Sequence, residues 1–425
     1  MIESVDTDRN RRSESGARPR VLHIATSALS LRLMRGQLAS LREAGFEVSV
    51  ITSPGDGLDA AEHSEGIKIH PVSVAREVSP WKDLKSLVRL YRVVRRLRPS
   101  ITNVGTPKAG LLGGIAARLA RVPCRFYTLR GLRCETTRGL KYRILLLSER
   151  VACLCAHRVI CVSESLRQKA IALGIVEPHR TLVLGSGSSN GVDFSQYSPT
   201  PVLLQSAAKL RLELKIPPES QVVGFVGRLT RDKGIAELVK AFSRLRGTSR
   251  TLRLLLVGDF EEGDPLPGDV RREIETNSKI IRTGFVPEAA AYYHLMDVLA
   301  LPTYREGFPN AVLEAHAAGK PVVATRATGV VDAMVDGVTG IMVPAGDAEA
   351  LAKSLELLIT NKDLAAAMGR AGHESVRREF QQERIWGALA REYSALLSAH
   401  GLARPETESH GVSSAVTADH TVVPS

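Results

Sequence analysis

Residues 306–314 read E-G-F-P-N-A-V-L-E and stand between two short apolar runs, Asp297 to Pro302 and Lys320 to Thr325. This order predicts a strand, a loop, a helix and a second strand. Pro309 suits the first turn of the helix, where its missing N–H costs nothing, and Gly307 allows the loop to approach a ligand closely. Because backbone N–H groups and the helix dipole favour negative charge, the start of this helix is a predicted anion site.

Two carboxylates flank that predicted site. Glu306 falls in the loop, whereas Glu314 falls more than one turn inside the helix. The helical rise predicts a separation of roughly 8 to 12 Å. A hydrolytic acid and base stand about 5 to 9.5 Å apart, so the pair fits better a molecule with a diphosphate in the middle and a sugar at each end. A nucleotide-sugar has that shape.

A second motif lies about 70 residues earlier. Residues 227–234 read G-R-L-T-R-D-K-G and follow the apolar run Val222 to Val226. The spacing predicts that Arg228 and Lys233 lie beside a helix N-terminus, where two cations stabilise a departing diphosphate.

Together these motifs resemble the signature of the retaining glycosyltransferases of family 4, over about residues 20 to 400. The resemblance also rests on the residues around the two glutamates, which are Asp297, Tyr304-Arg305, Phe308-Pro309-Asn310 and A-G-K-P-V-V-A at 318–324. It implies a GT-B fold, in which two Rossmann-like domains face a cleft. The C-terminal domain of such a fold holds the nucleotide-sugar, and the N-terminal domain holds mainly the acceptor.

The resemblance also implies roles for single residues. Arg228 and Lys233 would contact the diphosphate, Glu306 the hydroxyls of the transferred sugar, and Glu314 the ribose. The remaining donor-binding residues implied are Val286 near the base and Gly307, Phe308, Pro309 and Asn310 in the loop, where backbone N–H groups hold phosphate or sugar.

Two features depart from the family pattern. Family members often carry a glycine pair after the first strand, but residues 26–30 read T-S-A-L-S here. Many members place an active-site histidine after the strand that reads F-Y-T-L at 126–129, and this sequence offers Arg130 there. Arg130 and Lys108 are therefore the expected acceptor-side or cleft residues. Thr106-Pro107-Lys108 and the stretch 186–193 fit the members that build surface polysaccharides on a lipid carrier.

Alternating apolar strands and helices predict an α/β chain with parallel sheets covered on both faces. The expected N-terminal strands and helices include a helix from about Leu31 to Ala44 and a strongly basic helix from about Trp81 to Leu97. The predicted organisation is a disordered start (1–18), an acceptor domain (19–190), a nucleotide-sugar domain (191–380), a C-terminal helix (381–400) that crosses back to the first domain, and a disordered tail (401–425).

The charge is uneven along the chain. The first 200 residues hold 31 Lys and Arg against 17 Asp and Glu, so they carry the whole net charge of +12. A basic half suggests an anionic partner: nucleic acid, a lipid surface or a phosphorylated substrate. Aromatic residues make up only 4% of the chain and no stacking or zinc motif is present, which disfavours nucleic acid.

Other groups restrict the chemistry and the location. The five cysteines, which lie between Cys124 and Cys161, show no metal-type spacing and are expected to be buried thiols. His23 alternates with apolar residues and is expected in the core. No apolar run reaches 18 residues and Met1 to Arg18 is polar, so we expect a cytoplasmic protein, peripheral on the inner face of the plasma membrane.

The predicted activity is transfer of a sugar from a nucleoside diphosphate sugar, UDP-linked in our expectation, to a hydroxyl of a saccharide or lipid-linked acceptor. No cofactor and no metal are expected, because no Asp-x-Asp stands where a donor-site ion would sit. Retention at the anomeric carbon comes from the family resemblance alone. The alternatives are a nucleotide-sugar epimerase or sugar synthase of the same fold and, in another class, a basic nucleic-acid-binding protein.

Overall fold

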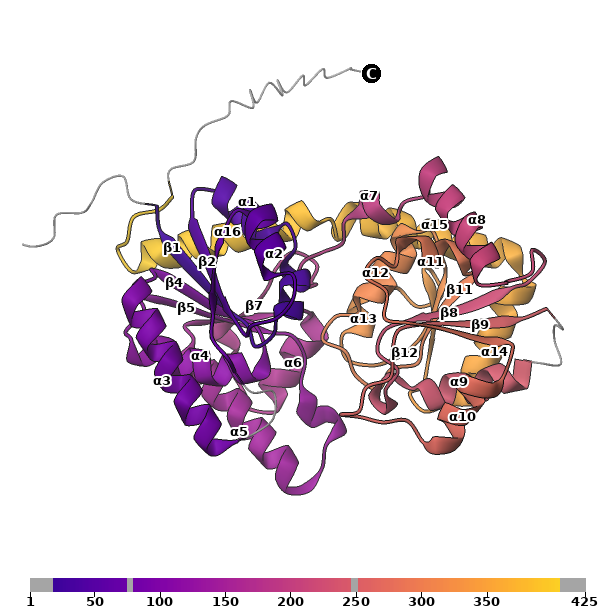
Figure 1. The fold of residues 1–425 in the computed structure, drawn as a ribbon, viewed down its shortest axis with the longest axis horizontal. Coiled ribbons are helices and arrows are strands. Elements are labelled where there is room, and N and C mark those ends of the chain that lie inside the picture. The colour runs from indigo at the N-terminus through magenta and orange to yellow at the C-terminus, as the bar shows by residue number, and fades with distance from the viewer. Residues whose placement is uncertain (1–17, 75–78, 246–250, 406–425) are drawn as a thin grey trace, which may run out of the picture.

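The computed structural model describes residues 18–74, 79–245 and 251–405. Two parallel sheets stand side by side, each with helices on both faces (Figure 1). Sheet one has the strand order β3-β2-β1-β4-β5-β6-β7 and sheet two the order β10-β9-β8-β11-β12-β13. The predicted pair of Rossmann-like domains is confirmed.

The first sheet is built from short, mostly buried strands. They are β1 (Arg20–Ile24), β2 (Glu47–Thr52), β3 (Lys68–Pro71), β4 (Ile101–Val104), β5 (Cys124–Leu129), β6 (Arg158–Cys161) and β7 (Thr181–Val183). Its helices are α1 (Gln37–Glu43), α2 (Leu58–Glu65), α3 (Pro80–Leu97), α4 (Pro107–Leu119), α5 (Gly139–Cys155) and α6 (Glu164–Ala172). The helix expected from Leu31 to Ala44 is divided, because a 3-10 helix (Ala28–Met34) ends before Gly36, whose φ of 78° breaks the helical path.

The second sheet repeats the alternation. Its strands are β8 (Val222–Val226), β9 (Arg253–Val257), β10 (Ile280–Gly284), β11 (Val298–Leu301), β12 (Val322–Thr325) and β13 (Gly340–Val343). The helices from the linker onward are α7 (Phe194–Tyr197), α8 (Pro201–Glu213), α9 (Ile235–Leu245), α10 (Gly268–Thr276), α11 (Ala290–Leu295), α12 (Asn310–Ala317), α13 (Val330–Ala333), α14 (Ala348–Thr360), α15 (Lys362–Glu379) and α16 (Gln382–Ala399).

The last helix joins the two domains. After α15 covers the second sheet, α16 runs across the top of the molecule to the first domain (Figure 1). Ile385, Leu389 and Tyr393 enter the core of the first domain, where the Tyr393 ring lies 4.9 Å from that of Phe126. The predicted return of the C-terminal helix is therefore confirmed, and burial of its apolar stripe fixes the chain end to the first domain.

Two smaller expectations, about the cysteines and His23, are confirmed by the described residues. All five cysteines are buried free thiols, as predicted. His23 is 3% exposed and lies in β1, as expected of a core histidine. Within residues 18–74, 79–245 and 251–405, no helix is long and apolar enough to cross a bilayer, and no cluster of three potential metal ligands occurs. The predicted tails lie almost wholly outside the described residues.

Candidate active site

The E-G-F-P-N loop joins β11 to α12 and places the two glutamates as predicted, one before the helix and one inside it. The helix begins at Asn310, and Pro309 is its N-cap with an extended ψ of 97°. The prediction of Pro309 in the first turn is therefore wrong by one residue. No side chain caps this helix end, so its first N–H groups are free of a side-chain acceptor and aim at the loop.

Lys233 and Glu306 form the centre of the site. The two motifs meet here, because Lys233 Nζ makes an ion pair with Glu306 Oε1. The side chains are 16% and 13% exposed, so water screens the pair only partly. Gly234 allows this packing, since its φ is 69° and a Cβ there would lie 1.9 Å from the carbonyl oxygen of Pro302.

Arg228 stands at the outer edge of the same loop and is more exposed than Lys233. Its guanidinium makes an ion pair with Glu261. Burial opposes the charged form, but the hydrogen bond and charge of Glu261 hold the pKa of Arg228 above its ordinary value. Arg228 is thus a permanent cation whose present partner is a surface carboxylate.

Asp232 connects the two motifs, although we assigned it no role from the sequence. Its carboxylate accepts a 2.7 Å bond from Arg305 Nη2 and a 2.6 Å bond from Thr230 Oγ1. Burial raises the pKa of Asp232, but the Thr230 bond and the charges of Arg305 and Lys233 outweigh it and lower the pKa. In the sequence Asp232 is visible only as an acid inside a run of cations. In the structure its hydrogen bonds position the loop.

Glu314 is held from the side of α11 and the linker. Tyr293 donates a 2.5 Å hydrogen bond to Glu314 Oε2, and Tyr197 bonds the same carboxylate. Burial raises the pKa of Glu314 even though both hydroxyls favour the ionised form. The sequence motif did not reveal these tyrosines, since they come from two other elements.

Gly307 contacts the first domain directly. A Cβ at Gly307 would lie 2.0 Å from the carbonyl oxygen of Arg130, and Ser163 Oγ donates a 2.8 Å bond to the carbonyl of Gly307. The missing side chain of Gly307 therefore makes room for the backbone after β5. Its expected place beside a ligand stays a prediction.

Phe308 and Val286 are placed mainly by packing. The Phe308 ring lies 5.5 Å from that of Phe380 and against Gly187 of the linker. Its side chain therefore fills the junction between domains, which leaves only its backbone for a ligand. Val286 follows the exposed Phe285 after β10 and is half-buried against the hydrophobic core of the second domain.

Hydrogen bonds from α13 and the residues before it also join the second domain to the first. Asp332 of α13 accepts a 3.1 Å bond from the backbone N–H of Ser165 at the start of α6 and a short one from its hydroxyl. Thr328 donates a 2.7 Å bond to Glu135. A carboxylate at a helix N-terminus is favourable, so α6 and α13 hold the two domains together.

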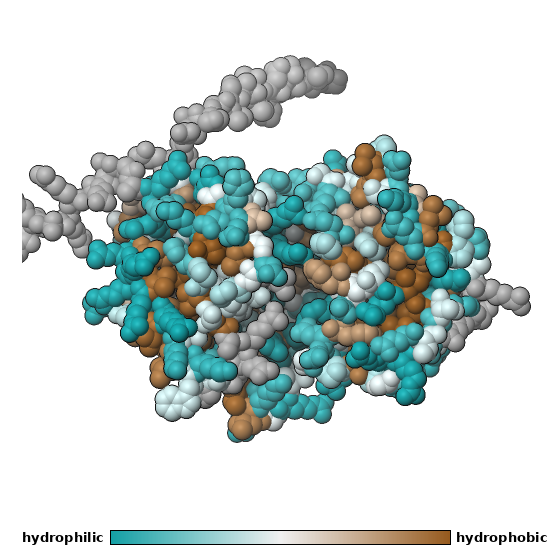
Figure 2. Space-filling model, in the orientation of Figure 1, coloured by the Kyte–Doolittle hydropathy of each residue, from teal (hydrophilic) through white to brown (hydrophobic). Residues whose placement is uncertain are grey.

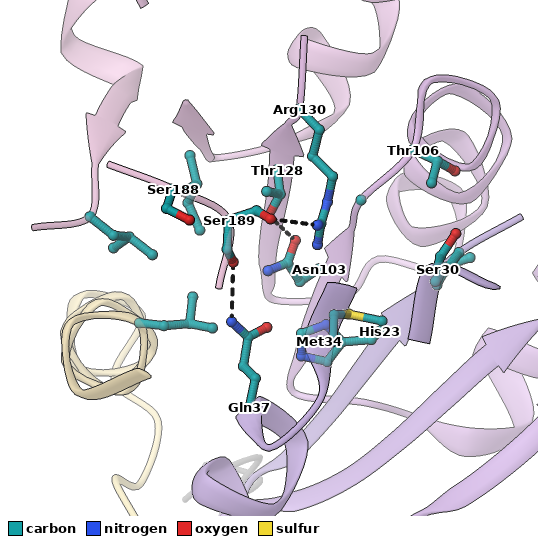
Figure 3. A pocket seen from close by; sticks show the side chains of 16 residues that line it. His23, Ser30, Met34, Gln37, Asn103, Thr106, Thr128, Arg130, Ser188 and Ser189 are labelled. Carbon is teal, nitrogen blue, oxygen red and sulfur yellow. Dashed lines mark hydrogen bonds between the residues drawn. The ribbon is translucent and has the colours of Figure 1, made fainter. Parts of the chain in front are cut away.

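The first domain carries a small polar pocket at the carboxyl ends of its strands (Figure 3). Arg130 follows β5 and donates a 3.0 Å bond from Nη1 to Ser189 Oγ. Thr128, Asn103 and Gln37 complete a hydrogen-bonded wall. The cavity of about 20 Å³ admits about one water molecule, so the pocket is a corner of the cleft rather than a whole acceptor site.

Arg130 has no ion pair among the described residues. Burial lowers its pKa to about 10, which still leaves the side chain charged at neutral pH. Burial and the Arg130 charge together lower the pKa of His23 to about 3, so that imidazole is neutral. A half-buried cation with one hydrogen bond used and no carboxylate partner among the described residues favours an anionic or strongly polar ligand.

Lys108 does not join Arg130 in this pocket. Its ammonium lies 2.7 Å from Asp83 of α3, and the pocket lining does not include it. Its side chain is directed towards α3, and a role at the acceptor side of the cleft stays a prediction.

Comparison with known families gives two matches that cover both domains. Residues 31–187 match a family described as "Glycosyl transferase 4-like domain", and residues 220–361 match one described as "Glycosyl transferases group 1". Together they span more than half of the chain.

Individual relatives agree. The capsular polysaccharide biosynthesis glycosyltransferase CapM of Staphylococcus aureus is 35% identical over 378 residues, which cover 89% of this chain and 97% of that protein. An Escherichia coli enzyme, UDP-Gal:alpha-D-GlcNAc-diphosphoundecaprenol alpha-1,3-galactosyltransferase, is 29% identical over 60% of this chain and 65% of its own length. Among solved structures, Anabaena Alr3699/HepE in complex with UDP-glucose superposes with a TM-score of 0.73 over 88% of this chain and 99% of that chain, at 21% identity.

Proposed function

The chain belongs to the family 4-like, group 1 glycosyltransferases of the GT-B fold, and from this membership we propose that it moves a sugar from a UDP-sugar to a hydroxyl of a lipid-linked saccharide, with retention. The coarser activity, glycosyl transfer in capsular or other surface-polysaccharide biosynthesis, follows from the family and from its CapM relative. The base, the acceptor and the stereochemistry are the proposal.

One observation carries the proposed roles: Lys233 and Glu306 meet beside the uncapped start of α12. In the proposed complex, the diphosphate takes Lys233 and Arg228 from their present carboxylate partners and accepts bonds from N–H groups in the first turn of α12, which no side chain caps. Glu306, released from Lys233, then accepts hydrogen bonds from the hydroxyls of the sugar, while Glu314 faces the ribose.

The chemical step exchanges one bond at the anomeric carbon for another. The bond from this carbon to the diphosphate oxygen breaks, and a bond to the acceptor oxygen forms on the same face. The acceptor proton passes to the departing diphosphate. Cations preorganised around the leaving group stabilise the negative charge that develops on it. This stabilisation is the main catalytic role that we propose for Lys233 and Arg228.

Two observations support a lipid-linked acceptor. The E. coli relative is named for a diphosphoundecaprenol-linked acceptor. Arg130 lies on the acceptor side without a carboxylate partner among the described residues, and a guanidinium in that setting suits an anionic or hydroxyl-rich acceptor. We therefore place the enzyme in the cytoplasm, at the inner face of the plasma membrane.

The test is release of UDP from a panel of UDP-sugars, with and without saccharides carried on a lipid diphosphate. We expect release that depends on acceptor, and an anomeric configuration in the product that matches the donor by NMR. Inversion would contradict retention. Conversion of the donor to another nucleotide-sugar, without need of any acceptor, would instead support the epimerase alternative.

A further inference from the structure

Two helices of the first domain expose rows of large apolar side chains. On α3, Trp81, Leu84 and Val88 follow one helical stripe and are 80%, 53% and 39% exposed. On α5, Leu140, Ile144 and Leu147 form a second stripe and are 73%, 46% and 61% exposed. Both spacings keep the side chains on one face of the helix, so each row is continuous.

The two rows belong to one layer. α4 packs against both α3 and α5, and the three helices cover the same side of the first sheet. In Figure 1 they lie along the lower left of the molecule, and the same region of Figure 2 shows brown hydrophobic surface between teal hydrophilic side chains. A patch of this kind on a water-soluble domain marks an interaction surface.

The charges beside the rows are positive. Exposed basic residues on the same helices include Lys82, Lys85, Arg89, Arg92, Lys141 and Arg143. The two helices contain two acids between them, and neither offers a free carboxylate to solvent: Asp83 makes an ion pair with Lys108, and Glu149 is buried against the Tyr127 hydroxyl. A second copy of the chain would therefore meet like charge with like charge across this face.

We propose that the exposed faces of α3 and α5 form a docking surface that inserts its apolar rows into an anionic lipid leaflet. Apolar side chains enter the boundary of the acyl chains while neighbouring Lys and Arg contact lipid phosphates, which is how interfacial helices bind. Trp81 fits this role because indole rings favour the membrane interface.

The docking surface lies next to the junction between the two domains, where a membrane-held acceptor would have to reach. α5 begins three residues after Thr136, whose hydroxyl accepts a 3.2 Å bond from Arg305 in the site loop of the second domain. The apolar row of α5 thus starts beside the junction of the domains. This role for the docking rests on the proposed lipid-linked acceptor, whereas the docking itself does not.

Co-sedimentation with vesicles tests the surface. We expect the full chain to bind vesicles of equal parts phosphatidylglycerol and phosphatidylcholine, and to bind pure phosphatidylcholine at least about tenfold more weakly. Leu140→Ser with Leu147→Ser should weaken binding by about tenfold or more. The matched control is Val202→Ser with Leu212→Ser on α8, where both side chains are 75% exposed, and it should bind like the wild type.

Tryptophan emission reports the insertion directly, because the chain has two tryptophans and the other, Trp386, is held by Asn190. Vesicles should shift the emission to the blue, and brominated acyl chains should quench it. The Trp81→Phe variant should show neither change in emission but should still co-sediment with the vesicles. Absence of vesicle binding, or an equal loss of binding in the α5 and α8 serine variants, would overturn the proposal. So would an α5 serine variant that binds vesicles like the wild type and differs from it only in oligomeric state in the absence of lipid. A UDP-induced thermal shift on the same samples reports donor binding separately, so failure of the surface and failure of the proposed function are distinguishable.

Discussion

Lys233 and Glu306 stand 73 positions apart in the chain, yet their charged groups form an ion pair in the largely buried centre of the site. The pair joins the loop after β8 to the loop after β11. Each partner is thereby oriented before any donor binds. Such preorganisation reduces the reorganisation that the diphosphate and sugar would otherwise require.

The two cations of the 227–234 motif, Lys233 and Arg228, should govern affinity for the diphosphate. We expect Lys233→Ala and Arg228→Ala each to weaken UDP binding by about tenfold or more, since a charge-assisted bond contributes about 1.5 to 3 kcal/mol. Uridine binding should scarcely change in either variant. Calorimetric titration measures both ligands.

Arg231→Ala is the matched control for that measurement. Arg231 lies in the same loop but is exposed and paired with Asp264, so its loss should leave UDP affinity as it was. Equal weakening of UDP and uridine by the Lys233 or Arg228 variant would point to a disturbed loop and contradict the assigned roles.

Arg130 should act on the acceptor side. Arg130→Met keeps much of the side-chain volume but removes the charge, so we expect a higher KM for the lipid-linked acceptor and an unchanged Kd for UDP. Arg130→Lys should recover part of the acceptor affinity, because it restores the charge without the planar fork. A loss of UDP affinity equal to the loss for the acceptor would move Arg130 to the donor site.

Asp332 should control how closely the domains sit. Asp332→Ala removes the carboxylate that accepts from Ser165, so small-angle scattering should give a larger radius of gyration, with UDP affinity retained. Asp336→Ala is the control, since Asp336 pairs with Arg326 inside the second domain. An unchanged radius in the Asp332 variant would show that the packing of Gly307 and Phe308 suffices to hold the domains.

Glu149 should make stability depend on pH. Burial raises the pKa of this carboxyl from 4.5 to about 7, against the opposing hydrogen bond from Tyr127. The folded state therefore keeps a proton that the unfolded state releases, and the resulting stability is complete below pH 4.5 and lost as pH rises to about 7.

Glu149→Gln isolates this effect. The difference in unfolding free energy, wild type minus variant, should fall by up to about 1.4 kcal/mol per pH unit across that window. A difference that stays flat, or rises, between these pH values would show that Glu149 is ionised in the folded protein.

The alternation of apolar runs was enough to predict both sheets, because parallel strands buried on both faces leave a clear pattern. The helix from Leu31 to Ala44 was predicted wrongly, since an isolated glycine in an apolar pattern does not by itself show where a helix is interrupted. Only the packed structure shows why Gly36 is needed: a Cβ there would lie 2.5 Å from the Trp386 ring of α16. That contact joins residues 350 positions apart in the chain, which no local pattern records.

The site divides in the same way. The two motifs indicated Lys233, Arg228 and the glutamates, because their chemistry is tied to fixed spacings, in each motif around the start of one helix, α9 or α12. Asp232, Tyr293 and Ser163 were not found, since each acts through a partner supplied by a distant element. The pairing of Lys108 with Asp83 was not predicted either, as the sequence gives no sign of it.

The most direct test of the account is Glu306→Gln, assayed for both turnover and UDP binding. The change keeps the size of the side chain and removes the charge that we assign to the sugar. We predict that UDP release in the presence of donor and acceptor falls by about a hundredfold or more, as for the loss of a preorganised contact made in the transition state, while the Kd for UDP stays within about threefold. A Glu306→Gln enzyme that turns over like the wild type would contradict the central claim.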